Sequence, residues 1–145
     1  MEIKIKRLNN NAIIPTRGSE KSAGYDIYAC WDNEIVIKHQ ETVKIGTGIA
    51  IQPPEGYFGA IFARSGLVIK NSLRPSNCVG VCDQDYTGEY IVALHNDDDE
   101  RSQVIKNGDR IAQLIFLPYT DVEFCEVNKL KKTERGAGGF GSTGK

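Results

Sequence analysis

Apolar and polar residues alternate in short runs along most of the chain, which is the pattern of β-strands rather than helices. Turn-forming segments rich in Asn, Asp, Gly and Pro separate the runs, as at residues 9–11 and 53–56. Many short strands at this spacing are typical of a β-sandwich or a β-barrel. Only residues 66–71 could form a helix of more than one turn. The predicted strands are centred on Ile3–Ile5, Ile35–Ile37, Val43–Ile45, Ile49–Ile51, Ile91–Ala93, Ile111–Gln113 and Phe124.

The last residues, 135–145, follow neither the strand nor the helix period and are rich in glycine. We therefore expect one domain over residues 1–129 and a flexible C-terminal arm over residues 130–145. The arm contains backbone N–H groups, hydroxyls and a guanidinium, which bind polyphosphates, and one phenyl ring on which a flat base could stack. Its G-x-G-x-x-G and G-x-x-x-x-G-K patterns lack the following helix that both phosphate-binding loops require. A disordered terminus without function is the alternative interpretation.

Composition restricts the function classes. A chain of 145 residues is long enough for a single domain with its own core and needs no disulfide or structural metal. The net charge is −1, and the basic residues are dispersed, which argues against a nucleic-acid partner. The N-terminal segment lacks the apolar core of a signal peptide, and no segment is apolar enough to span a membrane. We expect a cytoplasmic protein.

The cysteines, histidines and acidic run give no metal motif. The four cysteines form no C-x-x-C pair, and the two histidines lie far from any ligand spacing. We expect four free thiols, buried or half-buried, in a reducing compartment. The acidic run at residues 97–100 lacks the spacing of an EF-hand loop and is predicted to be a solvated hairpin tip.

Two segments carry candidate chemistry. Residues 80–89 are predicted to turn between two apolar strands as a hairpin, with Asn77 just before them. Asn77 offers an amide donor and acceptor, Asp83 a carboxylate and Tyr86 a flat ring, a set that could hold a nucleoside. An ordinary acidic turn is the alternative. Residues 63–66 follow an apolar strand and could form an anion-binding nest beside a guanidinium.

Five segments together resemble, in order and spacing, the five motifs of the homotrimeric deoxyuridine triphosphate nucleotidohydrolases, the dUTPases. They cover almost the whole chain. The resemblance implies an all-β jelly-roll β-barrel, a homotrimer with active sites shared between subunits, and closure of each site by the C-terminal arm. It also implies hydrolysis of dUTP to dUMP and pyrophosphate, which lowers dUTP and supplies dUMP for thymidylate synthesis. The segments are Ala23–Ala29, Arg64–Leu67, Gly80–Glu89, Gly108–Ile115 and Arg135–Gly144.

The same resemblance implies roles for individual residues. Asp83 would act as the catalytic general base on the water that attacks the α-phosphorus, and Asp26 would face a Mg²⁺ cofactor through water. Tyr86 would lie against the deoxyribose and Asn77 would read the uracil edge, while Phe140 would stack over the base. The remaining substrate-binding residues would hold the phosphate chain: Arg64, Ser65, Gly66, Gln113, Arg135, Gly141, Ser142 and Thr143.

Two other functions remain open. A dCTP deaminase of the same fold would need a glutamate acting on the cytosine amine, whereas this chain has the Asp-x-Asp-Tyr segment and a full phosphate-closing arm. A trimer that uses the nucleotide only to control binding of a partner protein is the second alternative. Three positions depart from the family pattern: Ala63 replaces a usual proline, Val68 a usual alanine, and Cys82 an aliphatic residue. Whether Cys82 makes the protein sensitive to thiol reagents is open at this point.

Overall fold

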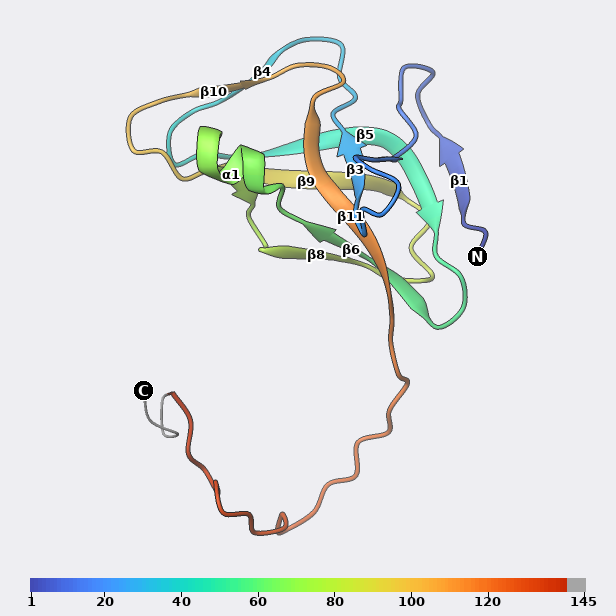
Figure 1. The fold of residues 1–145 in the computed structure, drawn as a ribbon, viewed down its shortest axis with the longest axis vertical. Coiled ribbons are helices and arrows are strands. Elements are labelled where there is room, and N and C mark those ends of the chain that lie inside the picture. The colour runs from blue at the N-terminus through green and yellow to red at the C-terminus, as the bar shows by residue number, and fades with distance from the viewer. Residues whose placement is uncertain (141–145) are drawn as a thin grey trace.

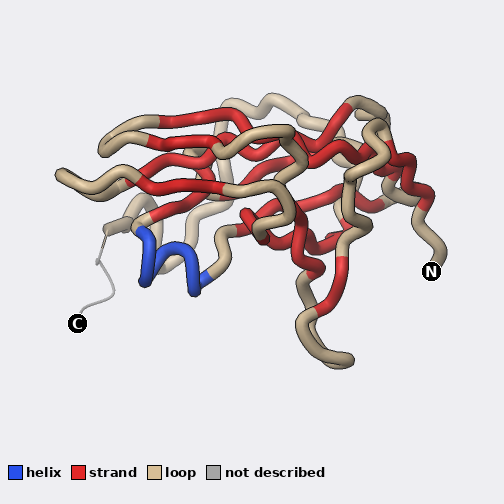
Figure 2. The backbone as a smooth tube through the Cα atoms, turned by 90° about the horizontal axis from the view of Figure 1, so that it is seen from above, coloured by secondary structure: helices blue, strands red, loops and turns tan. Residues whose placement is uncertain are grey.

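The computed structural model describes residues 1–140, and strands and loops make up nearly all of its body (Figures 1 and 2). One short helix, α1, lies at the periphery of this described part. In chain order the elements are β1 (Lys4–Arg7), β2 (Thr16–Arg17), β3 (Tyr25–Tyr28), β4 (Ile35–Ile37), β5 (Thr42–Gln52), β6 (Tyr57–Phe62), α1 (Ser65–Asn71), β7 (Leu73–Pro75), β8 (Val79–Cys82), β9 (Glu89–Asn96), β10 (Gln103–Ile105) and β11 (Arg110–Pro118).

The strands form three antiparallel sheets. A four-stranded sheet has the order β1-β5-β9-β7, a five-stranded sheet the order β2-β3-β11-β6-β8, and β10 pairs with β4. The all-β prediction is therefore confirmed. The strand pairings of residues 1–140 do not close into a barrel, since each sheet ends in edge strands.

The core lies between the two larger sheets. On β9, Tyr90, Val92 and Leu94 are buried while Ile91 between them is exposed, which is the period of two that places alternate side chains on opposite faces. The inward faces of both larger sheets contribute to one apolar cluster. It includes Ile49, Tyr90, Val92 and Leu94 from the four-stranded sheet and Ile27, Ile61 and Leu114 from the five-stranded sheet.

Several local predictions are confirmed, and others are corrected. The helix at residues 66–71 is confirmed as α1. The strands predicted at Val43–Ile45 and Ile49–Ile51 are one strand, β5, with a register shift between Gly46 and Ala50. The strand predicted at Phe124 is wrong: the residue is 94% exposed and in irregular structure. The alternating pattern around Phe124 has no neighbouring strand to pair with among residues 1–140, and an unpaired strand is not stable.

The hairpin predicted at residues 80–89 is also wrong. β8 pairs with β6 in the five-stranded sheet, whereas β9 pairs with β5 and β7 in the other sheet. The connecting loop therefore crosses from one sheet to the other. Likewise, the acidic run at residues 97–100 does not form a hairpin tip, because β9 and β10 belong to different sheets.

The four cysteines are free thiols, as predicted. Cys30 and Cys82 are buried, but Cys78 and Cys125 are exposed, contrary to the expectation that all four would be at least half-buried. Cys78 occupies a turn and Cys125 lies beyond the last strand, so neither faces the core. Among residues 1–140, no helix is long and apolar enough to cross a membrane.

Candidate functional site

A cluster of polar side chains lies where β3, β11 and β6 meet. Asp26 on β3 is directly opposite Gln113 on β11, and Gln113 is opposite Phe62, the last residue of β6. The chain then passes through Ala63 to Arg64, the residue that caps the N-terminus of α1. Nε2 of Gln113 donates a hydrogen bond of 2.8 Å to the carbonyl oxygen of Ala63 and holds this turn against the sheet.

Two guanidinium groups meet one carboxylate in this cluster. Nε of Arg64 lies 2.7 Å from Oδ1 of Asp26, and Nη1 of Arg110 lies 3.2 Å from Oδ2. Nη1 of Arg64 also donates to the carbonyl oxygen of Arg110 at 3.3 Å. Only 13% of the Asp26 side chain is exposed. The three charges sum to +1, so this cluster attracts anions.

The cluster surrounds a cavity of about 230 Å³. Gly24 lies close to Gln113, because a Cβ added at Gly24 would come within 2.5 Å of Oε1 of Gln113. At the start of α1, the N–H groups of Ser65 and Gly66 precede the first intrahelical bonds, which run from Leu67 and Val68 to the carbonyl oxygen of Arg64. Such first N–H groups are free to bind an anion. The cavity is lined by Gly18, Ser22, Gly24, Asp26, Arg64, Ser65, Gly66, Arg110 and Gln113.

Arg110 was missing from the predicted site for a geometric reason. In a regular strand, Arg110 and Gln113 would point to opposite faces, because they are an odd number of residues apart. The pairing of β11 with β3 shifts register between Arg110 and Ala112. This β-bulge turns Arg110 to the face of Gln113, where both reach Asp26 or its cavity. The signal for Arg110 in the sequence is its position in the segment Gly108–Ile115, which resembles a family motif.

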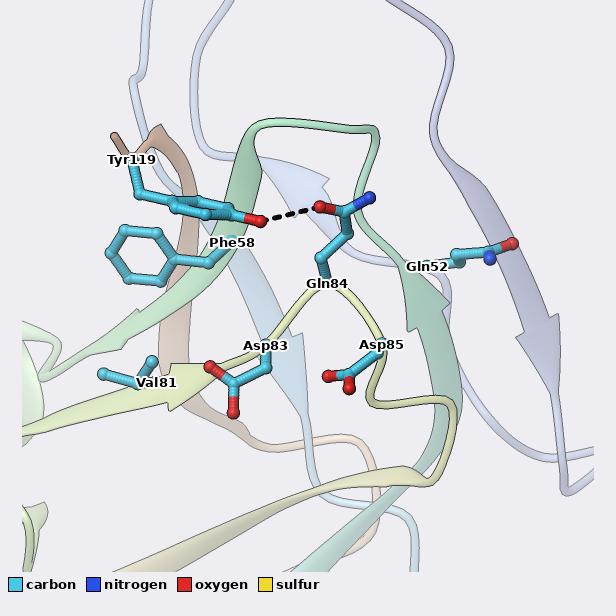
Figure 3. A pocket seen from close by; sticks show the side chains of 7 residues that line it. All are labelled: Gln52, Phe58, Val81, Asp83, Gln84, Asp85 and Tyr119. Atoms are coloured by element: carbon cyan, nitrogen blue, oxygen red, sulfur yellow. Dashed lines mark hydrogen bonds between the residues drawn. The ribbon is translucent and has the colours of Figure 1, made fainter. Parts of the chain in front are cut away.

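Asp83 lies in a second, larger cavity of about 830 Å³ (Figure 3). It follows the last residue of β8 and is exposed. Gln84 stands at the apex of the turn, with Asp83 and Asp85 on either side of it. The hydroxyl of Tyr119 donates a hydrogen bond of 2.8 Å to Oε1 of Gln84 and ties the end of β11 to this turn. The cavity is lined by Gln52, Phe58, Val81, Asp83, Gln84, Asp85 and Tyr119.

The two cavities lie far apart within one chain. The register places Val79 opposite Phe62, Phe62 opposite Gln113 and Gln113 opposite Asp26, which is three strand spacings. Asp83 lies four residues beyond Val79 along the chain. With about 3.3 Å per residue and about 4.8 Å between strands, the path from Asp26 to Asp83 along the sheet is roughly 20 Å. The structure therefore does not bring these two carboxylates together within a single chain.

Asn77 and Tyr86 line neither cavity. Asn77 is exposed in the turn between β7 and β8, so β8 separates it from Asp83. Tyr86 lies in the loop after Asp83 with 44% of its surface exposed, and its hydroxyl donates a hydrogen bond of 2.8 Å to the carbonyl oxygen of Glu89. The flat ring is thus held in place at the surface.

The predicted residues of the arm are separate from both cavities. After Pro118 the chain runs away from the sheets (Figure 1), and the hydrogen bonds found within residues 120–140 are local. Nε of Arg135 donates to the carbonyl oxygen of Gly138 at 2.8 Å, and Phe140 is fully exposed. Gly141, Ser142 and Thr143, which were also predicted to bind substrate, lie outside the described residues.

Cys82 directly precedes Asp83 and points inward, as its place on the strand predicts. Burial raises the pKa of the Cys82 thiol to about 11. A thiol with such a pKa is protonated at neutral pH and a poor nucleophile. Within residues 1–140, no three His, Cys, Asp or Glu side chains come together as a set of metal ligands.

Comparisons with known proteins agree on one family. Residues 10–144 match the family model described as dUTPase. The chain is 44% identical to the deoxyuridine 5'-triphosphate nucleotidohydrolase of Nautilia profundicola over 145 residues, covering 100% of both chains. It is also 44% identical to the protein of that name from Saccharomyces cerevisiae, covering 98% of this chain and 94% of the other. A structure of the dUTPase of Staphylococcus bacteriophage 80alpha with dUPNHPP superposes with a TM-score of 0.84 at 30% identity, covering 99% of this chain and 98% of that one.

Proposed function

The chain belongs to the dUTPase family, and we propose that it hydrolyses dUTP to dUMP and pyrophosphate at active sites shared between the subunits of a homotrimer. As a member of this family it is an enzyme, a dUTP nucleotidohydrolase. The reaction lowers the dUTP level and supplies dUMP for thymidylate synthesis. The proposal of a shared site rests on the separation of Asp83 from the anion cavity around Asp26 and Arg64. The anion cavity has the phosphate-binding groups but not Asp83, and the cavity of Asp83 lacks these phosphate-binding groups.

The anion cavity supplies the binding half of the reaction. The guanidinium of Arg64, the N–H groups of Ser65 and Gly66 and the amide of Gln113 would hold the phosphate chain of dUTP. The net charge of +1 offsets part of the triphosphate charge. Positioning and charge neutralisation account for most of the rate in phosphoryl transfer, so this half would fix the α-phosphorus for attack.

Asp83 would be the proton acceptor. It would come from a second subunit and hold a water molecule in line with the α-phosphorus. Its carboxylate would take the proton of that water as the new P–O bond forms and pyrophosphate leaves. The exposure of Asp83 at the rim of an open cavity leaves room for both the water and the substrate.

The residues present fit a Mg²⁺ ion bound mainly by the substrate. Asp26 is a single carboxylate, and both of its oxygens already contact guanidinium groups. It could therefore orient a water molecule of the ion rather than bind the ion as part of a protein cage, which is how Mg²⁺ usually binds with triphosphates. When bound, Mg²⁺ neutralises charge that develops on the phosphate oxygens.

The nucleoside would be held by the loops and the arm. Asn77 would pair with the uracil edge, and Tyr86 would pack against the deoxyribose and leave no room for a 2′-hydroxyl. Phe140 would stack over the base. Arg135, with Gly141, Ser142 and Thr143, would close on the terminal phosphates. The arm of residues 130–145 starts from a chain that has already left the sheets at Pro118, which gives it the length to reach another subunit.

An apolar outer face supports the trimer. Ile115, Ala60 and Val81 lie side by side across β11, β6 and β8; Val81 is 62% exposed and Ile115 half-buried, whereas Ala60 between them is already buried. Phe58, two residues before Ala60 on β6, is expected on the same face and lines the cavity of Asp83. A second copy that covered this face would bury it and bring its own anion cavity towards Asp83. We also propose the jelly-roll topology of the family and a cytoplasmic location.

Pyrophosphate release tests the proposal. The purified protein is supplied with dUTP or dCTP, with and without Mg²⁺, and both pyrophosphate and ammonia are measured. We expect pyrophosphate from dUTP, strongly stimulated by Mg²⁺, and little from dCTP. Ammonia from dCTP would indicate the deaminase alternative. Nucleotide binding without either product would refute the hydrolase and favour a nucleotide-controlled binding protein.

A further inference from the structure

The ring of Tyr86 is held by its neighbours rather than by its own backbone alone. It stacks on the ring of Tyr90, with centroids 6.3 Å apart and an angle of 28° between the ring planes. Its hydroxyl donates to the carbonyl oxygen of Glu89. The hydroxyl end of the ring also lies close to Gly88, where an added Cβ would come within 2.6 Å of the Tyr86 hydroxyl oxygen. These three contacts fix the ring in one orientation at the protein surface.

Tyr90 itself is anchored in the core. Its side chain is completely buried. Oγ1 of Thr47 donates to the carbonyl oxygen of Tyr90, and the N–H of Gly48 donates to the carboxylate of Glu89 at 2.7 Å. Both bonds attach the beginning of β9 to β5. The ring of Tyr90 is therefore held in place by the four-stranded sheet, and its stacking contact restricts the movement of the exposed ring of Tyr86.

The hydroxyl of Tyr90 is buried, and within residues 1–140 its polar neighbour is the thiol of Cys82, which is only a weak hydrogen-bond partner. It lies against Gly59, since a Cβ added there would be 3.0 Å from the hydroxyl oxygen, and Gly59 is the pairing partner of Cys82. A buried hydroxyl whose partner is a weak thiol adds little stability, so Phe should be tolerated at this position. The ring, and not the hydroxyl, is what the contact with Tyr86 uses.

We propose that Tyr90 is a positioning residue that sets the discrimination between dUTP and UTP by holding the ring of Tyr86 in place. This inference rests on the proposed role of Tyr86 against the deoxyribose. A ring that excludes a 2′-hydroxyl does so only if it cannot move aside, because one oxygen atom needs little space. Loss of the Tyr90 ring releases Tyr86 and admits UTP, whereas dUTP, which does not press on Tyr86, still binds.

The test compares kcat/KM for dUTP with kcat/KM for UTP in the variants Y90F, Y90L and Y90M. Y90F keeps the ring and is expected to keep the wild-type ratio with little change in stability. Y90L and Y90M remove the ring and are expected to lower the ratio about two- to tenfold, the range that the stabilisation by one aromatic pair supports. Leu94→Ala is the matched control: it also leaves a cavity in the core of β9 but lies four residues from Tyr90, and it should keep the ratio.

A second variant tests the same constraint without opening the core. Gly88→Ala pushes the Tyr86 ring away from its place by direct contact, so the ratio should fall even if neither Y90L nor Y90M folds. An unchanged ratio in Gly88→Ala, or in a folded Y90L or Y90M, overturns the proposal. A change in Y90F overturns it as well, because the hydroxyl would then be responsible.

Tyr86→Ala separates this inference from the proposed function. A lowered ratio in Tyr86→Ala, with no further decrease when Y90L or Gly88→Ala is added, supports the chain of contacts from Tyr90 through Tyr86 to the sugar. If Tyr86→Ala lowers the ratio but Y90L and Y90M do not, only the role of Tyr90 is wrong. If Tyr86→Ala leaves the ratio unchanged, the proposed role of Tyr86 is wrong, and the inference is refuted with it.

Discussion

The proposed shared active site leads to a mixing experiment with a quantitative outcome. Asp83→Ala removes the proposed proton acceptor, and Arg64→Ala removes the guanidinium of the anion cavity. The path of roughly 20 Å between Asp83 and the Asp26–Arg64 pair is too long for one substrate to bridge inside a protomer. Each variant alone should be nearly inactive. When the two chains are mixed in equal amounts, a site is complete if one subunit supplies Asp83 and its neighbour supplies Arg64. Random assembly gives this combination with a chance of about one half times one half, so about a quarter of wild-type activity should return.

A second mixture serves as the control. Wild-type chains are refolded with chains that carry both Asp83→Ala and Arg64→Ala. A shared site then requires two wild-type neighbours, and about a quarter of the sites should again be active. A site contained in one protomer would instead give about one half in this mixture and none in the first. Equal activities in the two mixtures are thus the signature of a shared site.

Pyrophosphate release from Mg·dUTP is the assay, and native mass spectrometry verifies that the subunits have mixed. Zero recovery from verified mixed trimers of the two single variants, together with about half activity in the control, would refute the shared site. It would mean that Asp83 reaches the anion cavity of its own chain through a rearrangement of the β8–β9 loop.

Three further outcomes are expected. Asp83→Asn keeps the shape of the side chain but removes the proposed proton acceptor, so kcat should fall about 10²-fold or more. Binding of Mg·dUTP, measured by calorimetry, should persist. Near-normal turnover would place the base elsewhere. Gly24→Ala should displace Gln113, because the new Cβ would lie 2.5 Å from its Oε1; KM for dUTP should rise, and an unchanged KM would exclude Gln113 from phosphate binding. Cys82 should resist iodoacetamide at pH 8, since burial raises its pKa to about 11, whereas exposed Cys78 should react; rapid labelling of Cys82 in the folded protein, followed by mass spectrometry, would contradict this.

The sequence predicted the strand content because the period of two is a local signal. Alternation along β9 identifies which side chains face the core, and the buried residues of that strand follow it. The partner of each strand is not a local signal. Residues 80–89 have the composition of a hairpin turn, yet the strands on either side belong to different sheets. The same limitation explains Phe124, whose neighbours alternate like a strand although no sheet edge in the described part of the chain pairs with them.

The site was predicted residue by residue but not as an arrangement. Asp26, Arg64, Ser65, Gly66 and Gln113 do converge on one cavity, which agrees with the grouping that the resemblance implied. Their convergence depends on the register that sets Asp26 opposite Gln113 and Gln113 opposite the end of β6. Register is a property of paired strands and cannot be read from either strand alone.

Arg110 is a residue of the site that strand periodicity alone misplaces. A count by twos along β11 places it on the face opposite Gln113, so periodicity assigns it to a different environment. One β-bulge reverses that assignment and brings a second guanidinium within 3.2 Å of Asp26. Because Arg64 and Arg110 both contact this carboxylate, Asp26 can be neutralised from two sides before any substrate is present. In the proposed site, a triphosphate would compete with Asp26 for these two cations, and the displaced carboxylate would then be free to orient the water shell of a metal ion. Substrate binding and the proposed metal site would thus be coupled through the same three side chains, a relation that only the folded register creates.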